Sequence, residues 1–295
     1  MTNEATPAGT LAAFTAVTMW GLGNVIVASI DMNGLAIGTY RLGLGTLVYL
    51  GVLYARGGRL SRDSFRYGWK GGLAFGLDIA TFFLAVRNTS VAIAVTLSAL
   101  QPVVIAGFAA VTFGERIRPR HVIATAVAVP AIGLVAFGAP DEGVRGTFGD
   151  IMAVLALFAW AAYFITSKKA RQHLPLMEYM TVLNLVGFVT VGSLALASGN
   201  IGGGDARPTA AAALGILGVL ALPGSGHIVM NWAHQHTTLM LTSLATLTMP
   251  VVSTGAAYIF LDQSVSAMQV VGIAIVLTAL AFVVIGDSRD ARIGV

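Results

Sequence analysis

The feature that most constrains the fold is an internal repeat of 51 residues. Residues 88–138 reappear in diverged form 148 positions later, at residues 236–286. The two copies share a proline and two glycines at equivalent positions: Pro102 and Pro250, Gly107 and Gly255, Gly138 and Gly286. Repetition over this length indicates that the fold contains two copies of one structural unit.

Each copy contains an apolar segment with a proline near its middle, a short polar hinge and a second apolar segment. Segments of about 18 to 20 apolar residues are long enough to cross a lipid bilayer as a helix, so each copy predicts a helical hairpin in the membrane. A proline within such a span removes one backbone hydrogen bond and kinks the helix, which predicts kinks at Pro102 and Pro250. Paired, interrupted spans are typical of transporters.

The composition requires a membrane. The chain is 56% hydrophobic and only 10% charged, and its mean hydropathy is +0.82. It has too few polar side chains to cover a water-soluble core of this length. The formal charge of +4 does not indicate a nucleic-acid partner, because the basic residues fall in short loops between apolar spans.

Apolar runs predict ten spans, near residues 11–30, 35–55, 70–88, 90–113, 121–138, 150–167, 176–198, 209–233, 237–261 and 266–286. We therefore expect an all-α integral membrane protein with ten transmembrane helices in two five-helix repeats. An odd number of helices per repeat inverts the second repeat relative to the first. Residues 1–295 form one transport domain, with repeats at 10–139 and 147–287.

Basic residues are distributed unequally between the two sets of loops. Arg41 lies within a span, which leaves sixteen Lys and Arg residues in the loops. The loops expected on the outer side hold three of them, Arg87, Arg145 and Arg207, and the loops expected on the inner side hold the other thirteen. Basic loops stay in the cytoplasm, so both termini are expected there.

The pattern resembles a known family. It combines ten spans in two inverted halves, a mid-span proline followed by glycine in spans four and nine, and the turn Phe113–Gly114–Glu115 before the fifth helix. Over about residues 10–287 it resembles EamA-type transporters of the drug/metabolite transporter superfamily, and is most similar to bacterial exporters of aromatic amino acids. In the second copy, Gln263 takes the position of Glu115. The resemblance implies a location in the bacterial inner membrane and a central cavity lined by helices one, three, four, six, eight and nine.

Asp78 is the main candidate for a functional charge. It lies near the middle of the third span, where a carboxylate costs roughly 2.5–3.5 kcal/mol on insertion scales, so it should face a cavity or a partner. We favour a role in substrate binding over a structural pair with Arg41. Arg41 itself is expected to reach the outer interface or Asp31.

The eighth span contains the sequence LPGSGH, residues 222–227. Pro223, Gly224 and Gly226 predict a broken helix, whose second half would offer free N–H groups to a substrate carboxylate. A kink used only for packing is the alternative. His227 and Asn231, one turn apart, are candidate substrate contacts, and a hydrogen-bonded structural role for His227 stays open.

Aromatic and polar residues near mid-span complete the predicted site. Trp20 with Asn24, and Trp160 with Tyr163, occupy helical spacings on repeat-related spans and could form two facing aromatic walls. The polar side chains of Ser98 and Gln101, which lie near Pro102, are expected to face the same cavity. For the aromatic residues, plain packing and interface anchoring are the alternatives.

The sequence contains no HExxH, G-x-S-x-G or P-loop motif, so we expect no enzyme, cofactor or metal site. The tract His234–His236 is expected to be a solvated turn. The predicted function is export of small amphipathic metabolites, most of all aromatic or apolar amino acids, by alternating access. Alternatives are a multidrug or other metabolite exporter and, less favoured, an intramembrane enzyme using Asp78 and His227. The partners are the small-molecule substrate and the bilayer; proton coupling, direction and oligomeric state stay open.

Overall fold

The structure is a computed structural model that describes residues 5–89, 91–139, 146–201 and 207–293. Within these ranges every regular element is helical. The elements are α1 (Pro7–Ala28), α2 (Gly34–Ala55), α3 (Arg62–Asn88), α4 (Val91–Ser98), α5 (Gln101–Phe113), α6 (Pro119–Phe137), α7 (Thr147–Ala170), α8 (Leu176–Ala197), α9 (Ala210–Val219), a π-helical turn (Leu220–Gly224), α10 (Ser225–Ala233), α11 (Leu239–Ala245), a 3₁₀ turn (Thr246–Thr248), α12 (Met249–Phe260) and α13 (Ala267–Ile293).

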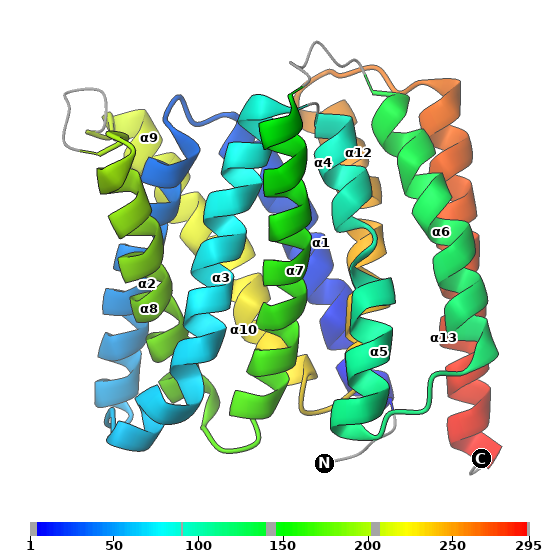
Figure 1. The fold of residues 1–295 in the computed structure, drawn as a ribbon, viewed down its shortest axis with the longest axis horizontal. Helices are drawn as coiled ribbons and strands as arrows, with labels where there is room; N and C mark the ends of the chain where they lie inside the picture. The colour runs from blue at the N-terminus through cyan, green and yellow to red at the C-terminus, as the bar shows by residue number, and fades with distance from the viewer. Residues whose placement is uncertain (1–4, 90, 140–145, 202–206, 294–295) are drawn as a thin grey trace.

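The helices cross one bundle in alternating directions (Figure 1). Nine segments of the described chain are long and apolar enough to span a bilayer. The tenth is α3, whose 27 residues lie in the same bundle but begin with a charged turn that lowers their hydropathy. The start of α1 and the end of α13 lie at the same end of the bundle, as an even number of crossings requires. The predicted fold class is confirmed, although Arg145, counted on the outer side, lies outside the described residues.

Several helices start at a side-chain cap that accepts a hydrogen bond from an otherwise unpaired backbone N–H. Thr6 caps α1, Asn33 caps α2, Ser61 caps α3, Thr209 caps α9 and Thr238 caps α11. Unpaired N–H groups are costly near a bilayer, so these residues fix where the crossings begin.

The two repeats interlock across the bundle. The first-repeat helix α1 packs on α10 and α12 of the second repeat, and α3 packs on α7 and α8. Glycines permit the closest approaches: a Cβ on Gly226 would lie 2.7 Å from the indole nitrogen of Trp20, and one on Gly23 would lie 2.6 Å from the ring of Pro223. Small residues at these crossings let the backbones approach closely, which strengthens van der Waals packing in a membrane.

The fourth and ninth spans are interrupted at equivalent positions. The fourth span divides into α4 and α5 at residues 99–100, directly before Pro102. The ninth span divides at the 3₁₀ turn Thr246–Thr248, directly before Pro250. Each proline occupies the first turn of the helix that follows, where its missing N–H breaks no intrahelical bond.

The predicted break in the eighth span is wrong. The chain passes from α9 to α10 through the π-helical turn Leu220–Gly224. Leu220, Gly224 and Ser225 keep right-handed helical backbone angles, so the helix continues through the turn. The wider turn accommodates the missing N–H of Pro223 without ending the helix. The carbonyls of Pro223 and Gly224 accept hydrogen bonds from Trp20 Nε1 (3.2 Å) and the Tyr49 hydroxyl (3.3 Å). No free helix N-terminus is therefore presented by this part of the described chain to a substrate carboxylate.

Candidate functional site

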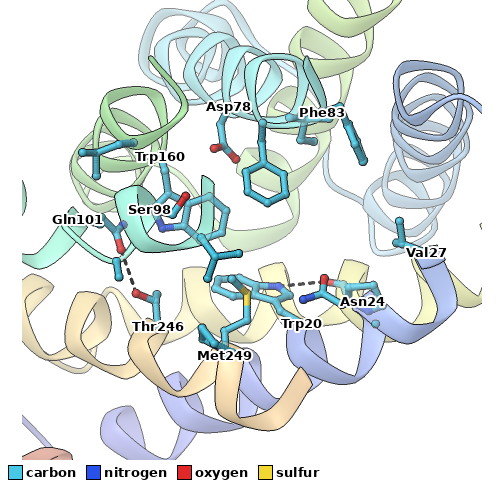
Figure 2. Close-up of a pocket in the computed structure, with 18 of the residues that line it drawn as sticks. Trp20, Asn24, Val27, Asp78, Phe83, Ser98, Gln101, Trp160, Thr246 and Met249 are labelled. Atoms are coloured by element: carbon cyan, nitrogen blue, oxygen red, sulfur yellow. Dashed lines mark hydrogen bonds between the residues drawn. The ribbon is translucent and has the colours of Figure 1, made fainter. Parts of the chain in front are cut away.

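A cavity of about 220 Å³ lies between the two repeats, near their interrupted spans. Its walls come from the first, third, fourth, sixth, eighth and ninth spans. The second span (α2) and the fifth span (α6) contribute one residue each, Arg41 and Ile132. The aromatic and polar residues that line it are Trp20, Asn24, Arg41, Phe75, Asp78, Phe82, Phe83, Ser98, Gln101, Trp160, His227 and Thr246. Figure 2 shows side chains from both repeats converging on this space.

Seven of the nine substrate-contact residues expected from the sequence line the cavity: Trp20, Asn24, Asp78, Ser98, Gln101, Trp160 and His227. The other two, Tyr163 and Asn231, are fully buried behind the wall. Of the expected hinge residues, Pro223 and Pro250 also line it, whereas Pro102, Gly224 and Gly226 lie in the surrounding helices.

Asp78 projects from α3 into the cavity (Figure 2). It is 7% exposed, and its side chain forms no hydrogen bond or ion pair with any described residue. Arg41 lines the same cavity with its guanidinium carbon 5.9 Å from the centre of the Phe75 ring. Arg41 and Asp78 therefore form no direct ion pair in this conformation, although their charges attract each other at longer range. The expectation that Arg41 reaches the outer interface is wrong, because Arg41 lines the cavity.

The aromatic residues form one cluster, not two facing walls. The rings of Trp20 and Trp160 meet edge to face with centroids 5.4 Å apart, and the fully buried Phe164 packs against both. The ring of His227 lies 4.7 Å from that of Trp20. Aromatic contacts of this kind stabilise the positions of the rings, so the cluster forms one ordered aromatic part of the cavity wall.

A hydrogen-bonded chain fixes His227 from behind. The Tyr163 hydroxyl accepts from Asn231 Nδ2 (3.0 Å) and lies 3.1 Å from His227 Nδ1. The contact with Asn231 uses a lone pair of the hydroxyl oxygen, so the hydroxyl proton is available to donate to Nδ1; with that assignment the ring proton of neutral His227 lies on Nε2. Tyr163 and Asn231 therefore orient His227, and the expected stacking of Tyr163 on a substrate does not match its position.

Gln101 and Thr246 link the two interrupted spans across the cavity (Figure 2). Their side chains approach to 3.0 Å, and the Thr246 hydroxyl lies 2.6 Å from the carbonyl of Ser243. Since that hydroxyl has one proton and the carbonyl contact is shorter, the amide is best oriented with Gln101 Nε2 donating to Thr246.

Sequence reasoning missed the apolar part of the third span. Phe75, Ile79, Phe82 and Phe83 line the cavity beside Asp78. These positions follow the spacing of one helix face, relative to Phe75 at i+3, i+4, i+7 and i+8. The helix face that carries Asp78 therefore predicts that these apolar residues line the same cavity.

At the end of the bundle opposite the cavity, which we call the closed end, a buried ion pair joins the two repeats. Lys168 Nζ on α7 donates to Glu115 Oε1 at 2.6 Å, and both side chains are buried. Glu115 also accepts from the backbone N–H groups of Leu239 (2.7 Å) and Met240 (3.1 Å) at the start of α11. A carboxylate at a helix N-terminus satisfies free N–H groups and the helix dipole together.

The nearby turn after α10 is buried, so the expectation of a solvated tract is wrong for His234. His234 is 1% exposed, and burial, together with the cations of Lys168 and Arg171, lowers its pKa to about 3. Arg171 donates to Gln235 and to the backbone carbonyl of Asn231, and burial lowers its pKa to about 10. This turn is a packed part of the closed end.

An inverted-repeat helical bundle with a central cavity defines a membrane transporter of small molecules. The sequence profile of the EamA-like transporter family matches residues 7–137 and 147–285. The chain belongs to this family, within the drug/metabolite transporter superfamily. A solved structure described only as "Crystal structure of protein" shares the fold, with a TM-score of 0.77 and 18% sequence identity over 93% of this chain and 96% of that one. No protein with a curated description matches the chain.

Proposed function

We propose that this transporter exports small amphipathic metabolites, and that aromatic or apolar amino acids are its substrates. The observation that carries the proposal is the composition of the cavity: an aromatic and aliphatic lining around one buried, unpaired carboxylate, Asp78. A ring or branched chain would bury its apolar surface against Trp20 and Trp160, and an ammonium group would neutralise Asp78. A carboxylate without a direct partner is costly inside a membrane, which favours a role for Asp78 in substrate binding over a role in stability.

The size of the cavity favours metabolites over drugs. Sites for drug-sized ligands have volumes of roughly 300–1,000 Å³, whereas this cavity has about 220 Å³. The multidrug alternative would require the cavity to expand. The intramembrane-enzyme alternative is disfavoured because Nδ1 of His227 is engaged by Tyr163, and Asp78 forms no hydrogen bond with any described residue.

Transport would proceed by alternating access between the two repeats. The cavity lies in the half of the bundle nearer the end of α1, and Glu115 and Lys168 join the repeats at the other end. We propose that this contact closes that end in the conformation described. From the basic loops, we propose that both termini are cytoplasmic and that the protein resides in the bacterial inner membrane. The conformation described would then be closed on the cytoplasmic side.

Flux measured in proteoliposomes tests the proposal. Labelled phenylalanine should accumulate by counterflow in vesicles that contain the protein and not in empty vesicles, while a cationic dye should not be transported. The measurement is repeated with and without a pH gradient. Dye flux without amino-acid flux would favour the multidrug alternative, and absence of both would contradict the proposal.

A further inference from the structure

Building on the proposed function, we propose that Arg41 and Asp78 bind the two charged groups of a zwitterionic α-amino acid. Arg41 would hold the carboxylate and Asp78 the ammonium. The cavity would then select amino acids over amines and over simple carboxylic acids with the same side chain.

The first observation is that each charge is available. Asp78 is 7% exposed, lines the cavity and has no side-chain partner among the described residues. Arg41 lines the same cavity and forms no direct ion pair with a described carboxylate, although its charge and that of Asp78 attract each other at longer range; its ring contact is with the face of Phe75. Buried or half-buried charges ordinarily form direct ion pairs, so two opposite charges that face one cavity without touching each other indicate a ligand with both signs.

The second observation is the chemistry of the remaining lining. Apart from Arg41 and Asp78, the one other titratable side chain that lines the cavity in the described chain is His227. One nitrogen of His227 is bonded to Tyr163 (3.1 Å), and its ring packs against Trp20 and Phe75. The guanidinium of Arg41 has a permanent charge and five N–H donors in a plane that matches a carboxylate. Arg41 is therefore the better carboxylate ligand.

The third step is the consequence for selectivity. A zwitterion would satisfy both charges at once, whereas an amine would leave Arg41 unpaired and a carboxylic acid would leave Asp78 unpaired. A binding site that leaves one of its buried charges without a partner rejects the ligand strongly. The aromatic cluster would contribute to the binding of all three ligand types equally, because it contacts only the ring.

The test compares three ligands that share a phenyl ring: L-phenylalanine, phenethylamine and 3-phenylpropionate. Binding to purified protein is measured by titration calorimetry for the unmodified chain and for Arg41→Gln, Arg41→Lys and Asp78→Asn. The unmodified protein should prefer phenylalanine. Loss of a charge-assisted contact of this kind corresponds to roughly a 10- to 100-fold weaker binding constant.

Arg41→Gln should weaken the binding of phenylalanine by that factor and strengthen that of phenethylamine, because it removes the charge that the amine leaves unpaired. Asp78→Asn should likewise weaken the binding of phenylalanine and strengthen that of 3-phenylpropionate. Binding of the truncated ligand that is retained or strengthened also demonstrates an intact cavity. Arg41→Lys, which keeps the charge, should retain part of the phenylalanine binding. Equal weakening of phenylalanine and phenethylamine by Arg41→Gln, or no weakening, would overturn the assignment while leaving the proposed function intact. Failure of the unmodified protein to bind phenylalanine would overturn both.

Discussion

Replacing Glu115 with Gln removes the negative charge from the contact that closes the bundle opposite the cavity. The Glu115 carboxylate accepts from Lys168 Nζ (2.6 Å) and from the backbone N–H groups of Leu239 (2.7 Å) and Met240 (3.1 Å). Glutamine has one acceptor oxygen in place of two. The Lys168 ammonium would then have only neutral acceptors: the glutamine oxygen and the carbonyl of Thr237 at 3.0 Å.

The magnitude follows from the burial of both partners. The side chains of Glu115 and Lys168 are 1% and 6% exposed, so water screens their interaction little. Removing one member of a buried pair costs about 3–5 kcal/mol, because it leaves the other charge without compensation. If the contact exists only in the state closed at this end, the same loss applies to the conformational equilibrium. A loss of about 3 kcal/mol changes that equilibrium roughly 150-fold.

Two assays measure the effect: thermal melting in detergent, and labelling of Ser98→Cys from the side of Glu115. The chain has no cysteine of its own, so the introduced thiol is the sole target. Glu115→Gln should lower the melting temperature and accelerate labelling. The matched control is Asp63→Asn, which makes the same chemical change in the exposed pair with Arg66, where both side chains are about two-thirds or more exposed and the expected effect is about 0–1 kcal/mol.

A second substitution separates charge from shape. Adding Lys168→Met to Glu115→Gln removes the stranded ammonium, so the double variant should recover part of the lost stability. The reasoning is refuted if Glu115→Gln behaves like Asp63→Asn, or if the losses of the two single variants simply add.

Three further predictions concern topology, the aromatic cluster and pH. Single cysteines at the exposed residues Arg59 and Ser198, which lie at opposite ends of the bundle, should label from opposite sides of the membrane; labelling from one side would contradict the inverted repeat. Trp20→Ala should reduce phenylalanine transport more than alanine transport in proteoliposomes, because the lost contact is with the ring; equal reductions would indicate packing alone. Because the pKa of His234 is lowered to about 3 from its ordinary 6.5, the unfolded chain binds the proton first, so stability should fall as pH decreases from about 6.5 towards 3. His234→Asn should flatten this melting profile, and an unchanged profile would contradict it.

The bundle could be predicted because its determinants are local. Span length and hydropathy identify the crossings, and the 148-residue repeat relates them. Even α3, which is too polar for a simple hydropathy criterion, is required by the alternation of the basic loops. Asp78 could be predicted as well, because a carboxylate at mid-span carries a cost that is independent of its neighbours.

What could not be predicted depends on contacts between distant helices. Pro223 was expected to break its helix, but the structure compensates the lost bond with a π-helical turn whose carbonyls are bonded by Trp20 and Tyr49. Trp160 and Tyr163 are three positions apart on α7, yet only Trp160 lines the cavity. The rotation of α7 that decides this is set by the packing of α7 against α3.

The closed end illustrates the same limit of local patterns. In the sequence Glu115 belongs to the turn Phe113–Gly114–Glu115, and Lys168 is one of the loop cations that indicate orientation. Their pairing joins residues 53 positions apart and is completed by the start of α11. No periodicity in the sequence encodes such a contact, because it depends on how the second repeat is placed against the first.

Substrate protection of the cavity tests the central claim most directly. A single cysteine at Ser98, which lines the cavity at the end of α4, directly before the interruption of the fourth span, should react with a small membrane-impermeant thiol reagent. L-Phenylalanine should slow that reaction with a half-maximal concentration equal to that for transport, whereas 3-phenylpropionate and phenethylamine at the same concentration should not. Labelling that is unaffected by phenylalanine at concentrations that saturate transport would show that the substrate binds elsewhere.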